Sequence, residues 1–167
     1  LSGIVELSAD QEVSVSIRIQ DADDSTRLVG PTLTFASTHR LPLLELLPES
    51  TYQVSAIVQN RCGLETSSDQ AVFQTGALPD DFPPMKVMVS KPEQMSGRIT
   101  LFSIFRQDSM EWGLLLGLDR KGRVVWYHRT ALRPNDVAPL SDGTLIYSHG
   151  LDAIVIDPLG KEIDRYN

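Results

Sequence analysis

The sequence is poor in cysteine, in histidine and in long apolar runs. Its single cysteine, Cys62, excludes an internal disulfide framework and a zinc site built from cysteines. The longest apolar stretches, such as residues 113–118, are far shorter than the roughly 20 residues of a transmembrane helix, so we expect no membrane span. The chain opens at Leu1 without a basic-then-apolar signal segment, and we expect a processed chain or a piece of a longer one.

An excess of basic residues is also missing. The net charge is −7, and it is uneven: residues 1–84 hold 12 acidic and 4 basic side chains, whereas residues 85–167 hold 10 and 11. A nucleic-acid interface needs clustered Lys and Arg, so no nucleic-acid partner is expected. The change in charge near residue 84 indicates two units. A hydrophobic content of 41% with 22% charged residues is typical of a folded protein.

Helical periodicity is almost absent. The best candidate, residues 41–47, contains Pro42 and is followed by Pro48, which favours a strand or an irregular segment. Apolar and polar residues alternate instead over 13–20, 51–58 and 71–75, the pattern of half-buried strands. We predict a β-sandwich over residues 1–77.

The most informative pattern is a repeat of residues 116–123 at 154–161. It places Asp119 on Asp157 and Gly122 on Gly160, 38 residues apart. Asp caps a tight turn with its carboxylate and Gly supplies the positive φ that a short hairpin loop needs. Such hairpins recurring at about 40–50 residues are the signature of β-propeller blades. A ring cannot close between residue 85 and Asn167, so we expect the front end of a larger assembly.

Strands are predicted at about 98–105, 112–118 and 123–129, which is a three-stranded set. A complete four-stranded set follows at about 135–140, 144–149, 153–156 and 161–166. The predicted fold class is all-β: a sandwich over 1–77, a Pro-rich linker over 78–90, and the first one to two blades of an incomplete propeller over 91–167.

The segment Leu47-Pro48-Glu49-Ser50-Thr51-Tyr52 resembles the corner before a late strand of fibronectin type III domains, and Phe73-Gln74-Thr75 resembles their last strand. In that family the Tyr hydroxyl bonds to upstream backbone, which gives Tyr52 a structural role. The sequence departs from the family in having no Trp before residue 112.

Three stretches resemble the bacterial aryl sulfotransferase family: Gly97-Arg98-Ile99-Thr100-Leu101-Phe102, Leu118–Trp126 with its Asp-x-x-Gly-x-Val-Val-Trp phrase, and Asn135–Leu145. The resemblance implies an exported protein, periplasmic or extracellular. It also implies a parent that transfers sulfuryl groups from phenolic sulfates to phenols through a histidine intermediate, without a nucleotide sulfate donor, and no cofactor is expected. Histidine suits that chemistry because its pKa lies near neutrality.

The catalytic phrase of that family begins with His, but Asn135 stands there in this chain. No catalytic residue is therefore assigned. Asn135 and His149 are candidates for lining a channel, while His39 is expected at the surface or in a turn of the first unit and His128 at a strand rim. Structural roles are expected for Asp119, Gly122, Trp126, Asp157 and Gly160.

Other candidate sites have simpler interpretations. No His, Cys and carboxylate set has metal-ligand spacing, and the acidic stretch 21–25 is interpreted as a loop rather than a calcium site. Trp112 and Trp126 are expected in the core, and Cys62 as an ordinary thiol. The expected function is that of a non-catalytic leading segment whose partners are the remainder of its propeller or neighbouring chains. The alternative is an adhesion or assembly protein that uses sandwich and propeller as binding surfaces.

Overall fold

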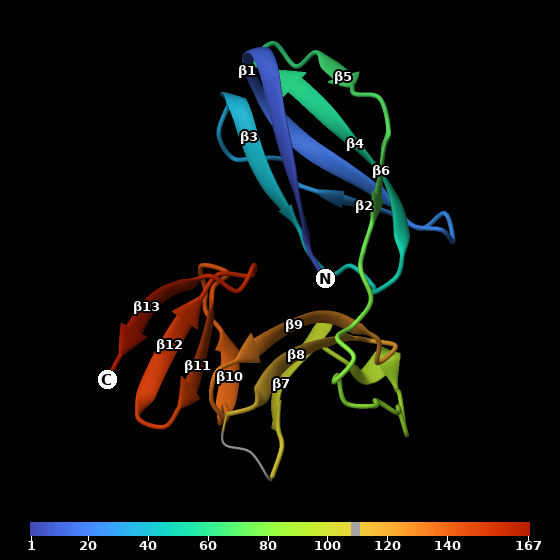
Figure 1. Ribbon diagram of the computed structural model, residues 1–167. Helices are drawn as coiled ribbons and strands as arrows, with labels where there is room; N and C mark the ends of the chain where they lie inside the picture. Colours follow the sequence, from blue (N-terminus) through green and yellow to red (C-terminus); the bar gives the residue numbers. More distant parts are fainter. Residues whose placement is uncertain (108–110) are drawn as a thin grey trace. The chain divides into compact units, whose positions relative to one another are not determined.

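The computed structural model describes residues 1–107 and 111–167, which form two compact units, Ser2–Asp80 and Asp81–Asn167. Apart from one 3₁₀ helix, η1 (Pro92–Gln94), the regular elements of these residues are β-strands (Figure 1). The protein is all-β, with antiparallel sheets of which none closes into a barrel. Over the described residues, no helix has the length and apolar character needed to cross a membrane.

The first unit is one six-stranded sheet built around a long first strand. Strand β1 pairs with β3 along its first half, and its second half lies between β2 and β4. The change of partner coincides with a shift in register between Ser8 and Val13. Strands β5 and β6 both pair with β4. The bounds are β1 (Gly3–Gln20), β2 (Thr26–Val29), β3 (Ala36–Leu43), β4 (Thr51–Asn60), β5 (Glu65–Ser67) and β6 (Ala71–Gln74).

Alternation along β1 and β4 builds the core of this unit, as the sequence predicts. Every second residue of β1 from Val13 to Ile19 is buried, because successive side chains of a strand point to opposite faces. Residues 41–47, for which the sequence predicts a strand or an irregular segment, form the end of β3 up to Leu43 and then a turn. Side chains from β1, the end of β3, the following turn and β4 complete the cluster: Val13, Val15, Ile17, Ile19, Leu41, Leu43, Leu46, Tyr52, Val54 and Ala56.

Tyr52 is buried in this core, with only 5% of its surface exposed. The Leu47 backbone N–H donates a hydrogen bond to its hydroxyl oxygen at 2.8 Å. This is the bond to upstream backbone that the sequence predicts. Thr75 ties the same turn to the end of β6: its hydroxyl donates to the Leu47 carbonyl at 2.5 Å and accepts from the Ser50 N–H at 2.9 Å.

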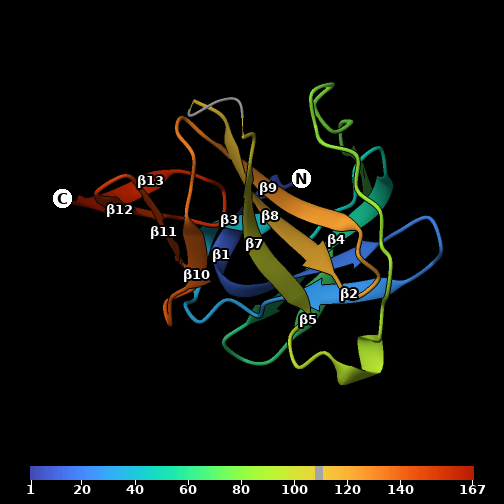
Figure 2. The ribbon, with the colours of Figure 1, turned by 90° about the horizontal axis from the view of Figure 1, so that it is seen from below.

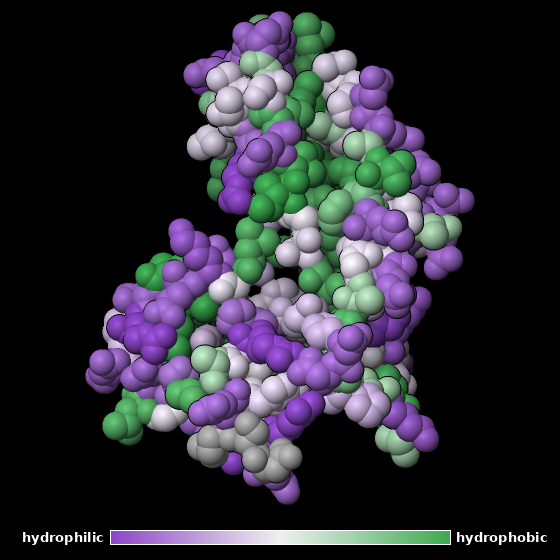
Figure 3. All heavy atoms as spheres, viewed as in Figure 1, coloured by the Kyte–Doolittle hydropathy of each residue, from purple (hydrophilic) through white to green (hydrophobic). Residues whose placement is uncertain are grey.

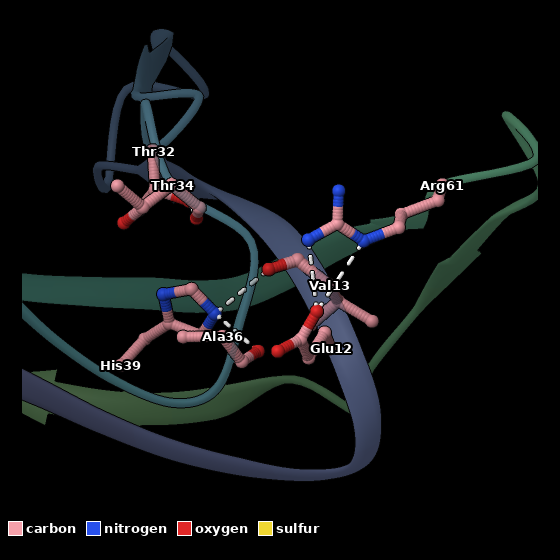
Figure 4. Close-up of polar contacts among 7 residues, drawn as sticks. All are labelled: Glu12, Val13, Thr32, Thr34, Ala36, His39 and Arg61. Carbon is pink, nitrogen blue, oxygen red and sulfur yellow. Dashed lines mark hydrogen bonds and ion pairs between the residues drawn. The ribbon is translucent and has the colours of Figure 1, made fainter.

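His39 lies neither at the surface nor in a turn, and that expectation was wrong. Its side chain is 9% exposed on β3, and its Nε2 lies 2.9 Å from the Val13 carbonyl oxygen and 3.0 Å from that of Ala36 (Figure 4). Both partners are acceptors, so Nε2 carries the proton. The register shift of β1 ends at Val13, and the imidazole holds that point of β1 to the start of β3.

The second unit contains two sheets that pack face to face. The three-stranded sheet has the order β7-β8-β9 and the four-stranded sheet the order β10-β11-β12-β13. The expected strands are all present, with ends shifted by at most one residue. Their bounds are β7 (Ile99–Phe105), β8 (Gly113–Asp119), β9 (Val124–Thr130), β10 (Asp136–Pro139), β11 (Leu145–His149), β12 (Asp152–Ile156) and β13 (Glu162–Tyr166).

The interface between these two sheets is an apolar core crossed by Trp126. The indole N–H of Trp126 donates to the Pro158 carbonyl at 2.8 Å, which links β9 to the turn between β12 and β13. Trp112 is also buried. Both tryptophans thus lie in packed positions, as expected. The core cluster consists of Leu115, Trp126, Val137, Leu145, Tyr147, Ile154 and Ile156, with Leu101 against it.

Residues from Asp81 onward belong to the second unit and contact its β7–β9 sheet (Figure 2). The Asp81 carboxylate accepts from the Trp112 indole at 3.1 Å and from Arg129 at 2.5 Å, and the Phe82 ring meets Tyr127 edge-on. The hydrogen bond from Arg129 lowers the pKa of Asp81 to about 2, below its ordinary 3.8. Only the first part of the expected linker, 78–80, precedes this attachment, and the rest belongs to the second unit.

The two units also differ in the surface that Figure 3 shows. Hydrophobic side chains gather over the middle of the first unit, whereas hydrophilic side chains dominate the visible face of the second. The net charge also differs between the units, because the first half of the sequence carries the acidic excess and the second half is nearly neutral.

Candidate functional site

The residues singled out by the repeat form two turns of the same geometry. In each, the Asp N–H donates to the carbonyl four residues on, and the Gly N–H donates back to the Asp carbonyl. The Oδ1 atoms of Asp119 and Asp157 each accept two further hydrogen bonds from backbone N–H groups, at 2.8–2.9 Å. Gly122 and Gly160 have φ of 76° and 87°. The repeat of the sequence is therefore a repeat of three-dimensional structure.

The same hydrogen-bond frame recurs at three turns that lie outside the sequence repeat. At Asn60 the side-chain oxygen replaces the carboxylate, and at Asp21 the carboxylate accepts from the N–H of Asp23 and Ser25. The Asp21 turn is thereby a backbone cap, which supports the loop interpretation of the acidic stretch. The fourth position of that turn is Asp24, with φ of 60°, where the other turns have Gly. The third turn is Leu140–Thr144, in which Asp142 accepts from Thr144.

The turn at Gly160 lies directly against His128. A Cβ atom on Gly160 would stand 2.7 Å from the His128 Nδ1, closer than atoms approach without displacement. His128 was expected at a strand rim, but its ring is half-buried and stacks on Trp126 with centroids 6.3 Å apart. Burial lowers the pKa of His128, so its imidazole is neutral at neutral pH.

A row of rings continues from His128 across the sheet interface to His149. The centroids of His128 and Tyr147 lie 6.0 Å apart, and those of Tyr147 and His149 lie 6.1 Å apart. Tyr147 is 7% exposed and His149 8%. Burial, followed by the charge of Glu162, raises the pKa of Tyr147, which keeps its phenol protonated.

Charged residues of β12 and β13 border this row. Asp152 lies opposite His149 in the strand register, and Arg165 binds the Asp152 carboxylate at 2.7 Å and that of Glu162 at 2.8 Å. The hydrogen bond from Arg165 lowers the pKa of Glu162, and the two carboxylates raise the pKa of Arg165. Arg165 and Glu162 are consequently charged together at neutral pH.

The cluster has the parts of a transfer site but not an open arrangement. A neutral imidazole is a nucleophile or base, a phenol is a proton donor, and a guanidinium stabilises an anionic group. Here Arg165 is occupied by two carboxylates, and Tyr147 and His149 are more than nine-tenths covered. The rings of Tyr147 and His149 thus pack in the row, whereas Arg165 is paired within its own sheet.

The two channel candidates occupy different environments. Asn135 is exposed just before β10, where its backbone N–H donates to the Ser148 carbonyl at 2.8 Å and its carbonyl accepts from the Ser103 hydroxyl at 3.1 Å. It joins the two sheets through its backbone. His149 lies within the ring row. The sequence did not reveal the roles of Tyr147 and Arg165, because their partners lie on other strands or at other positions of the sheet.

Two further expectations concern the thiol and metal binding. Cys62 is exposed in the Asn60 turn, where its backbone N–H donates to the Asn60 side-chain oxygen at 2.9 Å. Among residues 1–107 and 111–167, no group of three or more His, Cys, Asp or Glu side chains is arranged to hold a metal ion.

Comparison with known proteins yields no match to this chain among family models, curated proteins or solved structures.

Proposed function

We propose that this chain is the non-catalytic leading segment of an aryl-sulfotransferase-like exported protein. In this proposal the first unit is a fibronectin-like sandwich, and the two sheets of the second unit are the opening blades of a propeller. The observation that carries the proposal is the stacking of two antiparallel sheets whose hairpins share one Asp-x-x-Gly turn, with Trp126 between the sheets.

The first-unit part of the proposal is supported by Tyr52. Its buried ring and the hydrogen bond from the Leu47 N–H have the arrangement of a tyrosine corner. The single long strand β1, which pairs with β3 and then with β4, provides the change of sheet partner that a sandwich requires. A completed propeller has four to eight blades, so the proposal requires further blades besides these two.

The absence of catalysis is supported by the state of the candidate groups. His149 and Tyr147 are covered, and Arg165 is bound by Asp152 and Glu162. Asn135 lacks the imidazole that would carry a sulfuryl group. A transfer reaction needs a nucleophile and cationic groups that both reach the substrate.

The test is a sulfuryl-transfer assay with the 167-residue chain, a chromogenic phenyl sulfate and a phenol acceptor. We expect no turnover above the uncatalysed rate for the native chain and for the His149→Ala and His128→Ala variants. Turnover that either substitution abolishes would overturn the proposal, because it would identify a working histidine. An experimental structure in which the β7–β9 and β10–β13 sheets are not related by rotation about a common axis would remove the propeller part.

A further inference from the structure

An open groove runs between the segment after Asp81 and the β8–β9 hairpin of the second unit. Its volume is about 640 Å³, within the range of small-molecule sites. Two contacts hold its walls together: the Ser90 hydroxyl donates to the Arg120 carbonyl at 3.0 Å, and the Arg120 Nε donates to the Gly97 carbonyl at 3.0 Å. Because both contacts bridge the two walls, the groove is a feature of the folded unit.

The lining of the groove is apolar and adaptable. Three of the four methionines of the chain, Met85, Met88 and Met95, contribute to it, together with Val87, Val89 and Leu118. Met88 is 78% exposed. Unbranched thioether side chains adjust to ligands of different shape and are frequent at binding surfaces that accept varied partners.

Basic side chains border this apolar lining in a chain of net charge −7. Lys86, Lys91 and Arg120 all line the groove. Neither lysine forms an ion pair within residues 1–107 and 111–167. The acidic residue at the groove, Asp119, is bound by Arg123 at 2.8 Å and by turn N–H groups. Positive charge therefore predominates at the groove, and the two lysines can bind an anionic group.

We propose that this groove binds a small amphiphile with an apolar body and one anionic group. The methionines and Leu118 contact the body, while Lys86 and Lys91 bind the anionic group. The chemistry follows from the juxtaposition of an adaptable apolar wall with unpaired cations. The proposal does not depend on catalysis or on the sulfotransferase resemblance.

The test uses two fluorescent probes that share an apolar body: anilinonaphthalene sulfonate, which is anionic, and phenylnaphthylamine, which is neutral. Titration of the 167-residue chain should give saturable one-site binding of the anionic probe, with the neutral probe bound about fivefold more weakly. The double variant Lys86→Gln/Lys91→Gln should lose about fivefold in affinity for the anionic probe only. The matched control, Lys161→Gln, removes an exposed lysine of the Asp157 turn and should bind like the native chain.

Two measurements keep the result interpretable if a variant folds poorly. Added salt should weaken binding of the anionic probe to the native chain and leave the neutral probe unaffected. The methyl resonances of Met85, Met88 and Met95 should shift on binding. Equal affinities for both probes, an unchanged double variant, an equal loss in Lys161→Gln, or unshifted methionine methyls would each overturn the proposal.

Discussion

Replacement of Gly160 by alanine separates backbone strain from side-chain packing. At φ of 87° any L side chain is strained by about 1–2 kcal/mol. In addition, the new Cβ would lie 2.7 Å from the His128 Nδ1 and 3.3 Å from its Cε1. Overpacking of this kind costs about 1–3 kcal/mol. We therefore expect Gly160→Ala to lower the free energy of unfolding by about 2–5 kcal/mol.

Gly143→Ala is the matched control. Gly143 also has φ of 87°, but no atom lies within 4 Å of the position that an alanine Cβ would take, so only the strain of about 1–2 kcal/mol is expected. The difference between the two variants measures the contact with His128. In the double variant Gly160→Ala/His128→Ala, the steric part of the loss should disappear relative to His128→Ala alone.

The assay is urea unfolding followed by tryptophan fluorescence. Both tryptophans, Trp112 and Trp126, belong to the second unit, so the signal reports on that unit alone. Gly63→Ala, in a turn of the first unit, should leave the fluorescence transition unchanged. Equal losses for Gly160→Ala and Gly143→Ala, or no coupling between Gly160 and His128, would refute the reasoning.

Three further predictions concern single side chains. Tyr52→Phe should lower the free energy of unfolding of the first unit by about 1 kcal/mol, because the Leu47 N–H loses its acceptor. This unit has no tryptophan, so its unfolding is followed by circular dichroism, and an unchanged stability would contradict the corner role of Tyr52. Asp24→Gly should stabilise that same unit by up to about 1 kcal/mol, because the strain of about 1–2 kcal/mol relieved at φ of 60° exceeds the entropic cost of glycine of about 0.5–1 kcal/mol. Destabilisation would contradict this reasoning. The pKa of Asp81 is depressed from 3.8 to about 2, so its stabilising contribution is complete above the ordinary pKa and is lost as pH falls toward 2. The urea midpoint of the native chain, followed by tryptophan fluorescence, should fall over that pH window, and Asp81→Asn should flatten this dependence. Identical pH profiles of the native chain and the variant would contradict a stabilising role of the Asp81 carboxylate.

Local chemistry explains why much of the second unit was predictable. Asp119 and Asp157 specify their turns within five residues, because the carboxylate caps the N–H groups beside it. Alternating apolar residues then place the strands on either side. Asp24 shows the limit of this signal, since a non-Gly residue occupies the positive-φ position and the identical turn went unrecognised.

The candidate site was less predictable because its members come from separate strands. His39 alternates with exposed neighbours on β3, and only the carbonyls of Val13 and Ala36 explain its burial. The contact between His128 and Gly160 likewise depends on how the two sheets stack. No short-range pattern contains that information.

The sequence by itself determined the all-β class, the strand positions of the second unit and its two Asp-x-x-Gly turns, because these depend on alternation and on capping within a few residues. The tertiary structure alone decided that Asp81 anchors the expected linker to Trp112 and Arg129, and that His149 is enclosed beside Tyr147. Both outcomes depend on long-range packing, in which desolvation and charge pairing between distant residues decide which side chains are covered.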